Sequence, residues 1–245
     1  MADQQTFISH LIELRGRLVK IVVAILVIVV VQLPFAGKIY SIMAQPVMAY
    51  LPEGSSMIAT GVLSPFLTPF KMVFILGIIL SMPIILYQIW AFVAPGLYKH
   101  EKRIAKPLLF SSIFLFYLGC LFAYFIIFPI LFQFIPSISP VGVNYMPDIN
   151  SYLDIVVRMF FAFGLAFEVP IAVILMILMG VTTPEKLANN RPYVIVGVFV
   201  LGMILTPPDM ISQTLMAIPM WLLFELGIIM GRILKRRRSE EKPAE

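Results

Sequence analysis

Residues 18–35 read LVKIVVAILVIVVVQLPF, and no charged side chain interrupts the run after Lys20. A helix needs about 20 mainly apolar residues to cross the roughly 30 Å hydrocarbon core of a bilayer, so this run is long enough to be a membrane span. Five further runs of this kind follow along the chain. They cover residues 68–94, 107–132, 152–179, 193–206 and 211–231. The sequence therefore predicts an all-α membrane protein with six transmembrane helices.

The composition of the 245 residues agrees with this class. Hydrophobic residues make up 60% of the chain and charged residues only 13%, and the mean hydropathy is +0.98. A soluble domain carries about 25% charged residues, roughly twice this share. The formal net charge of +5 does not indicate a nucleic acid partner, because the cations lie at the ends of apolar runs. We expect one integral membrane domain, 1–245, with no separate soluble part.

The placement of Lys and Arg predicts the orientation of the chain. Three of these residues lie in 1–20, four in 95–106, two in 180–192 and six in the tail 232–245, whereas Lys38 is alone in the loops of the other side. Loops rich in Lys and Arg stay in the cytoplasm. We therefore expect both termini to be cytoplasmic, as an even number of spans requires.

The segments on the outer side have features of their own. Apolar residues recur at helical spacing in 39–51, which predicts a short amphipathic helix bent at Pro46. The tight hairpin Thr206-Pro207-Pro208-Asp209 joins the last two spans, of which the fifth, at 193–206, is unusually short. The chain has 19 prolines, several of them within spans. Because each tends to kink its helix, we expect a curved, cupped bundle with a short final hairpin.

The chain contains no sequence motif of enzymes or of nucleotide binding. G-x-S-x-G, H-E-x-x-H, G-x-x-x-x-G-K-[ST] and G-x-G-x-x-G are all absent, which argues against a hydrolase, a metalloprotease or an internal ATP motor. Cys120 is the single cysteine, and His10 and His100 are the only histidines. We therefore expect no metal site, no cofactor and no enzymatic activity.

One carboxylate falls deep within a predicted span. Glu168 lies about 18 Å from the inner end of the span 152–179, near the middle of the bilayer. A charge at this depth is costly, so Glu168 must be protonated, be paired, or face a wet cavity. Arg158 lies on another side of the same helix, and we expect it to pair with Asp154 at i,i−4 instead. Glu168 is either a polar recess for substrate or protons, or a neutral, hydrogen-bonded structural acid.

Two further carboxylates lie in basic surroundings on the predicted cytoplasmic side. Glu13 precedes Arg15 and Arg17, and Glu101 lies between Lys and Arg residues. A carboxylate accepts a guanidinium group bidentately, so the two could each hold one arginine of an incoming peptide. Local pairing, for example of Glu13 with Arg17 at i,i+4, is the other interpretation.

The order of several motifs resembles the TatC family, the multispanning receptor of the twin-arginine protein translocase. The matching stretches are HLIELR at 10–15, MIAT at 57–60, SPF at 64–66, YQIWAFVAPGLY at 87–98, AFG at 162–164, FEVP at 167–170, RPY at 191–193 and LTPPD at 205–209, with Gln213 after them. They cover nearly the whole chain in order. As a series they are highly specific.

The resemblance implies a function in the export of folded proteins. A member of this family recognises precursor proteins by a signal peptide with paired arginines, works with the single-span subunits TatB and TatA, self-associates in a receptor complex, and depends on the proton-motive force. Such a protein is a multi-pass component of the bacterial cytoplasmic (inner) membrane. A proton-coupled small-solute transporter that uses Glu168 is the alternative function.

The same resemblance assigns roles to residues of this chain. Glu13 and Glu101 would bind the arginines of the signal peptide, with Phe92, Leu97 and Arg103 shaping the same site. Glu168 would be the polar group on the concave face of the bundle. Thr206 and Gln213 would form the patch where partner helices dock. Asp209 would be the acidic tip of the outer hairpin, and Pro46 also matches the family in the outer loop.

Overall fold

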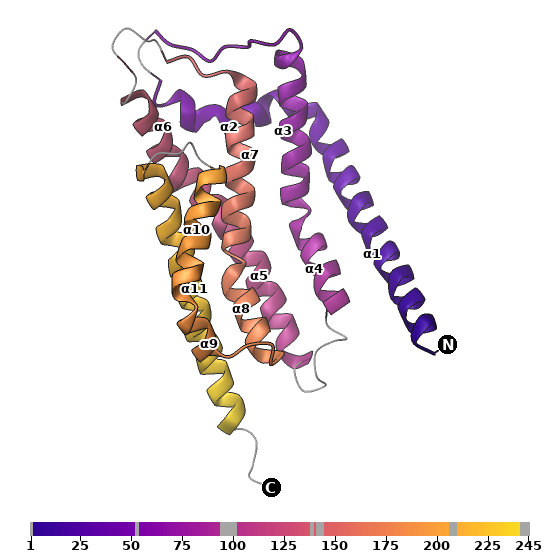
Figure 1. Ribbon diagram of the computed structural model, residues 1–245. Coiled ribbons are helices and arrows are strands. Elements are labelled where there is room, and N and C mark those ends of the chain that lie inside the picture. Colours follow the sequence, from indigo (N-terminus) through magenta and orange to yellow (C-terminus); the bar gives the residue numbers. More distant parts are fainter. Residues whose placement is uncertain are drawn as a thin grey trace. The chain divides into compact units, whose positions relative to one another are not determined.

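The computed structural model describes residues 2–51, 54–93, 102–137, 140, 145–205 and 210–240 (Figure 1). Within these residues every named element is a helix, and the only β-type contact is an isolated bridge between Ile58 and Asp148. The predicted all-α class is therefore confirmed.

The chain divides into two compact units. The first consists of Met1–Gln45, Met57–Leu109 and Asp148–Leu153, and the second of Pro46–Ser56, Phe110–Pro147 and Asp154–Glu245. Each unit is built from segments that are distant in the sequence.

The first predicted span and the amphipathic segment fall in two consecutive helices. Helix α1 (Ala2–Gln32) is followed by a short 3₁₀ turn, Leu33–Phe35, and by α2 (Ala36–Met48), which contains Pro46. The turn begins with a proline in its first positions, where the missing N–H costs no helical hydrogen bond.

The second predicted span is a broken helix. Helix α3 (Ser64–Leu80) and α4 (Met82–Val93) meet at an angle of 45°. Pro83 explains the break, because it has no N–H to donate to the carbonyl group four residues earlier. The hydroxyl of Ser81, at the junction, donates to the carbonyl oxygen of Gly77 at 2.6 Å.

The third and fourth predicted spans are also built from more than one segment. Helix α5 (Lys102–Phe122) passes through one π-helical turn, Ala123–Ile127, into α6 (Phe128–Ser137). Helix α7 (Ile149–Ala166) ends just before Glu168, and α8 (Val169–Leu178) begins just after it. Pro170 occupies the first turn of α8, where its lack of an N–H is tolerated.

The last part of the chain differs from the predicted short hairpin in one respect. A small helix, α9 (Pro184–Asn189), precedes α10 (Arg191–Leu205), whose 15 residues make it short as predicted. Helix α11 (Met210–Glu240) is 31 residues long and continues well past 231. Its final turns consist of Arg, Lys, Ser and Glu without Gly or Pro, and this composition allows the helix to continue.

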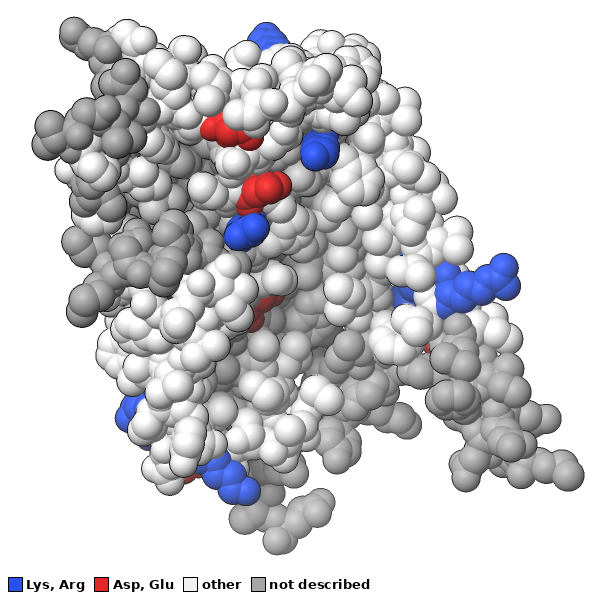
Figure 2. Space-filling view, turned by 45° about the horizontal axis from the view of Figure 1, so that its top comes forward, with Lys and Arg blue, Asp and Glu red and all other residues white. Residues whose placement is uncertain are grey.

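Several of these helices are apolar enough to cross a membrane. Four continuous helical stretches qualify by length and composition: Ile12–Met48, Lys106–Ser137, Ile149–Leu178 and Gln213–Arg236. The bent pair α3–α4 makes up to five, and α10 is a shorter apolar helix. The face in Figure 2 is mostly uncharged, with few Lys, Arg, Asp or Glu side chains among the residues described. The protein is therefore a multi-pass membrane protein.

The second unit is held together by close packing of α8 against α11. Val173 and Ile177 of α8 form a buried cluster with Phe224 and Ile228 of α11. Gly227 of α11 lies against the backbone of α8. A Cβ atom at this position would stand 2.9 Å from the Cα of Pro170 and 3.0 Å from the Cβ of Val173. Gly231, one turn later, lies against the side chain of Ile177. Small residues four apart are the usual means of bringing two membrane helices together.

A polar cluster joins the beginning of α7 to the segment before α3 in the first unit. The carboxylate of Asp148 accepts hydrogen bonds from the backbone N–H and the hydroxyl of Thr60, at 2.9 and 2.8 Å, and from the backbone N–H of Asn150 at 3.0 Å. The Asn150 side chain accepts from Thr68 at 2.6 Å and donates to Ser64. Asp148 thus caps α7 and ties two distant segments together.

Replacing Gly227 by Ala should destabilise the protein. The new methyl group would meet the backbone of Pro170, which cannot move aside as a side chain can, so we expect the free energy of unfolding to fall by roughly 1–3 kcal/mol. Thermal unfolding of the purified protein in detergent measures this effect.

Gly197→Ala in α10 is the matched control. A Cβ atom at Gly197 would meet nothing within 4 Å, and alanine favours a helix over glycine by about 1 kcal/mol. Gly197→Ala should therefore leave the protein as stable as before or more so. Equal stability of the two variants would contradict the proposed close packing.

Acid should weaken the cluster around Asp148. The hydrogen bonds from Thr60 and from the backbone lower the pKa of Asp148 to about 2, whereas an unfolded Asp has a pKa of about 3.9. A depressed pKa stabilises the folded state above the unfolded value, and this contribution is lost between about pH 4 and pH 2. Thermal midpoints measured across this range should fall less for Asp148→Asn than for the unchanged protein. An Asp148→Asn variant whose midpoint falls as steeply with acid as that of the unchanged protein would contradict this contribution.

Candidate functional site

The first half of α1 carries Glu13 in an ion pair. Arg17 donates to the carboxylate of Glu13 through Nε at 3.0 Å and through Nη2 at 2.5 Å, both times to Oε1. The two side chains are 21% and 40% exposed. The local pairing expected at i,i+4 is confirmed, and the carboxylate of Glu13 remains accessible.

Arg17 also connects α1 to α4. Its Nη1 donates to Oε1 of Gln88 at 3.3 Å, and its Nη2 donates to the backbone carbonyl oxygen of Ala91 at 3.1 Å. One guanidinium group therefore has acceptors on two helices. This connection holds Glu13 beside the last turns of α4.

The other residues predicted for the signal peptide site are described only in part. Phe92 is half-buried near the end of α4. Leu97 and Glu101 lie outside the described residues, and for Arg103, in the first turn of α5, only the backbone is described. The predicted juxtaposition of Glu13 and Glu101 therefore stays a prediction.

Glu168 lies at the break between α7 and α8. The hydroxyl of Ser112 in α5 donates to its Oε2 at 2.5 Å, while its Oε1 is buried and has no hydrogen-bond partner among the described residues. Ser112 itself is 1% exposed. The carboxyl group is therefore hydrogen-bonded on one side and has an unused oxygen on the other.

The expected ion pair between Arg158 and Asp154 is wrong. The ion pairs that the structure records among the described residues are Arg17–Glu13 and Arg191–Glu225. Asp154 and Arg158 are both exposed, one turn apart on α7. On an exposed helix face, the energy gained by such a pair is too small to fix two long side chains in one geometry.

Arg191 and Glu225 form a two-pronged contact between α10 and α11. Nε of Arg191 donates to Oε1 of Glu225 at 2.5 Å, and Nη2 donates to Oε2 at 2.8 Å. The side chain of Glu225 is 16% exposed. This two-pronged contact fixes the beginning of α10 to the middle of α11.

The opposite ends of α10 and α11 meet through Gln213. Its side-chain amide donates to the backbone carbonyl oxygen of Phe199 at 2.8 Å. Thr206 and Asp209 lie outside the described residues, and Pro46 lies within α2. The structure thus places one of the two predicted docking residues between the two helices.

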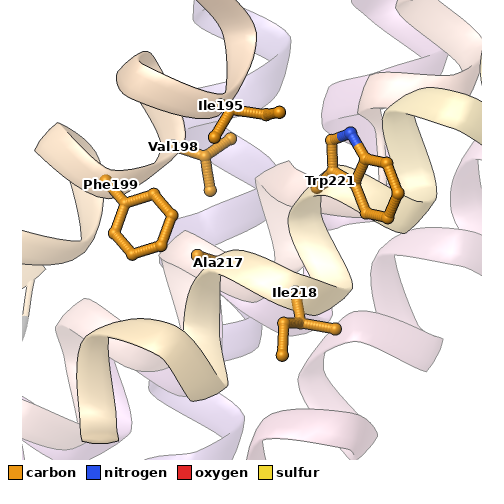
Figure 3. Close-up of a pocket in the computed structure, with 6 residues that line it drawn as sticks. All are labelled: Ile195, Val198, Phe199, Ala217, Ile218 and Trp221. Atoms are coloured by element: carbon orange, nitrogen blue, oxygen red, sulfur yellow. The ribbon is translucent and has the colours of Figure 1, made fainter. Parts of the chain in front are cut away.

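A small apolar pocket of about 230 Å³ lies between α10 and α11. Figure 3 shows Ile195, Val198 and Phe199 on α10 opposite Ala217, Ile218 and Trp221 on α11. The indole N–H of Trp221 is buried without a hydrogen-bond partner among the described residues.

Sequence reasoning did not find several of these polar contacts. Gln88, Ser112 and Trp221 each place a polar atom in an apolar helix. A polar side chain within an apolar run is the sequence feature that indicates such contacts. No group of His, Cys, Asp or Glu that could hold a metal ion occurs within the part of the chain that the structure describes. The site offers carboxylates and hydrogen-bonding groups that can bind a cationic or polar segment.

Comparisons with known proteins agree with the resemblance in the sequence. The family model of the Sec-independent protein translocase protein TatC matches residues 9–219. The chain is 56% identical to the Sec-independent protein translocase protein TatC of Azotobacter chroococcum mcd 1, over 97% of this chain and 92% of that protein. It is 53% identical to the protein of the same name of Escherichia coli (strain K12), over 98% and 93%.

A solved structure is similar as well. The crystal structure of the twin arginine translocase receptor TatC has a TM-score of 0.80 and 40% identity, with 91% of this chain and 98% of that chain covered. That fold is helical and is shared over nearly the full length of both chains. Together with the apolar helices and the family match, this shows that the chain belongs to the TatC family of Sec-independent protein translocase proteins and is a multi-pass component of a protein translocation machinery.

Proposed function

We propose that this protein binds the paired-arginine signal peptide of folded precursor proteins and assembles with TatB and TatA for export driven by the proton-motive force. The observation that carries the proposal is the accessible carboxylate of Glu13, 40% exposed on α1 and held beside the end of α4. The solved relative is itself called a twin arginine translocase receptor. Membership of the translocase family supports the same function.

The arginine already bound to Glu13 suggests how a signal peptide would bind. An exposed i,i+4 pair contributes only about 0.3–0.5 kcal/mol, so an incoming arginine can replace Arg17 on Glu13. Arg17 does not lose its other acceptors, because Gln88 and the carbonyl group of Ala91 remain in reach. Exchange of one guanidinium for another keeps the carboxylate paired throughout.

Glu101 is the proposed second carboxylate. It follows α4 in the chain and precedes α5, and the segment from Val93 to Glu101 can extend by at most about 28 Å. Because Arg17 fixes α1 against α4, Glu13 lies near the end from which this segment departs. Phe92, Leu97 and Arg103 complete the proposed site.

The remaining assignments follow from charge and family membership. Both termini lie in the cytoplasm, the whole chain forms one integral domain of the inner membrane, and the six spans are those predicted from the sequence, with α10 as the short fifth. Glu168 supplies a polar group within the bundle. Thr206 and Gln213 form the docking patch for partner helices, and Asp209 and Pro46 act in the outer loops.

Removing the two carboxylates tests the signal peptide site. Glu13→Gln combined with Glu101→Gln should weaken binding of a twin-arginine signal peptide about 100-fold, since each charge-assisted hydrogen bond contributes about 1.5 kcal/mol or more. Binding is measured with the purified full-length protein and a fluorescent signal peptide, and with photocrosslinkers placed at positions 97 and 206.

Glu185→Gln is the matched control. Glu185 lies in α9, on the same predicted cytoplasmic side, and losing this carboxylate should leave binding unchanged. A peptide with two lysines in place of the arginines should bind weakly to the unchanged protein, because lysine cannot form the two-pronged contact. Undiminished binding by the double variant would contradict the assignment. Uptake of a small solute by the chain alone, dependent on Glu168, would favour a proton-coupled carrier instead.

A further inference from the structure

A long groove runs along one side of the second unit. It has a volume of about 960 Å³ and lies between α7–α8, α10 and α11. Its walls include Ala162, Leu165, Val169, Leu201 and Phe224, and every residue that lines it is apolar except Arg158. Along α7 and α8 the groove extends from Val157 to Val169, or about 18 Å, which is slightly more than half of the roughly 30 Å hydrocarbon core. An apolar channel of this length fits one acyl chain of one lipid leaflet.

Two opposite charges, Asp154 and Arg158, lie where the lining of the groove begins along α7, and they do not form an ion pair with each other. Arg158 lines the groove, and Asp154 lies one helical turn nearer the beginning of α7. Both side chains are exposed, and the structure records no ion pair for either of them among the described residues. A cation at such a position in a membrane helix needs an anionic or polar partner.

The order of these groups along α7 matches the order of groups in a phospholipid. From the end of the helix inward come a carboxylate, a guanidinium and an apolar channel. In an aminophospholipid lying in the membrane, the ammonium, the phosphate and the acyl chains follow in the same order. Residues four apart on a helix are neighbours on one face, with Cβ atoms about 5–6 Å apart, which suits the short ethanolamine link between phosphate and ammonium.

We propose that this groove is a binding site for phosphatidylethanolamine. The phosphate of the lipid pairs with Arg158, the ammonium pairs with Asp154, and one acyl chain fills the groove. A purely anionic headgroup is disfavoured by the carboxylate of Asp154. A choline headgroup is disfavoured because its methylated ammonium cannot donate a hydrogen bond. The proposal goes beyond signal peptide binding and holds for either orientation of the chain, since α7 begins at a membrane surface in both.

The test measures lipid binding to the full-length protein. The delipidated protein in detergent is titrated with phosphatidylethanolamine, phosphatidylcholine and phosphatidylglycerol of identical chains, and bound lipids are counted by native mass spectrometry. The unchanged protein should prefer phosphatidylethanolamine by about tenfold, the effect of one charge-assisted contact. Glycerophosphoethanolamine, which has no acyl chains, should not compete.

Single substitutions separate the contributions of Asp154, of Arg158 and of the apolar groove to lipid binding. Asp154→Asn should abolish the preference for phosphatidylethanolamine and increase binding of phosphatidylglycerol. Arg158→Gln should weaken binding of all three lipids. Ala162→Phe should also weaken all three, because it fills the groove without changing a charge. Lys71→Gln removes an exposed cation from α3, outside the groove, and should change nothing.

Several results would overturn the proposal. Equal binding of the three lipids by the unchanged protein would do so, as would an Asp154→Asn variant with unaltered selectivity. If Arg158→Gln fails to fold, Asp154→Asn and Ala162→Phe still decide the matter, since they leave the cation in place. Occupation of the groove by a hydrophobic helix of a partner protein, with no lipid selectivity, would assign the groove to protein docking instead.

Discussion

Inside a bilayer no water is available to hydrogen-bond a backbone carbonyl, so every interruption of a helix has to be compensated within the protein. Among the residues that the structure describes, helices break just before Pro83 and just before Pro170, and each proline lacks the N–H of a helical hydrogen bond. At the first, the backbone N–H of Ser81 donates to the carbonyl oxygens of Gly77 and Ile78, and its hydroxyl donates to that of Gly77. At the second, the chain leaves Glu168 between two helices, where Ser112 donates to its carboxyl group. The position of this buried carboxyl group therefore depends on a broken helix.

The few charges of the molecule are used in two different ways. Most cations lie outside the apolar helices and favour one orientation in the membrane. Other charged side chains connect helices. Arg17 connects α1 to α4, and Arg191 forms a two-pronged contact with Glu225 between α10 and α11. Asp154 and Arg158 are exposed and form no ion pair with each other or with another helix among the described residues. Both are therefore available to a ligand of the groove that Arg158 lines.

Prediction from the sequence worked best for features with a regular period. The apolar runs, the amphipathic segment with Pro46 and a short fifth helix can be predicted, because their signals are length, spacing and proline. The sequence predicts a span that ends at 231 but does not predict that α11 continues to Glu240, because charged residues end an apolar run without ending a helix. The ion pair of Arg158 and Asp154 was expected from spacing alone, and spacing permits a contact without enforcing it.

The amino-acid sequence therefore specifies how many apolar segments there are, where prolines interrupt them and which ends carry positive charge. These properties are local, since each depends on residues within about one helix length. The choice of polar partners belongs to the folded chain: Ser112 meets Glu168 across 56 positions, and Arg17 reaches Ala91 across 74. Only packing brings such residues within hydrogen-bonding distance. The groove likewise exists because α7, α8, α10 and α11 pack around it, and no single helix carries that information.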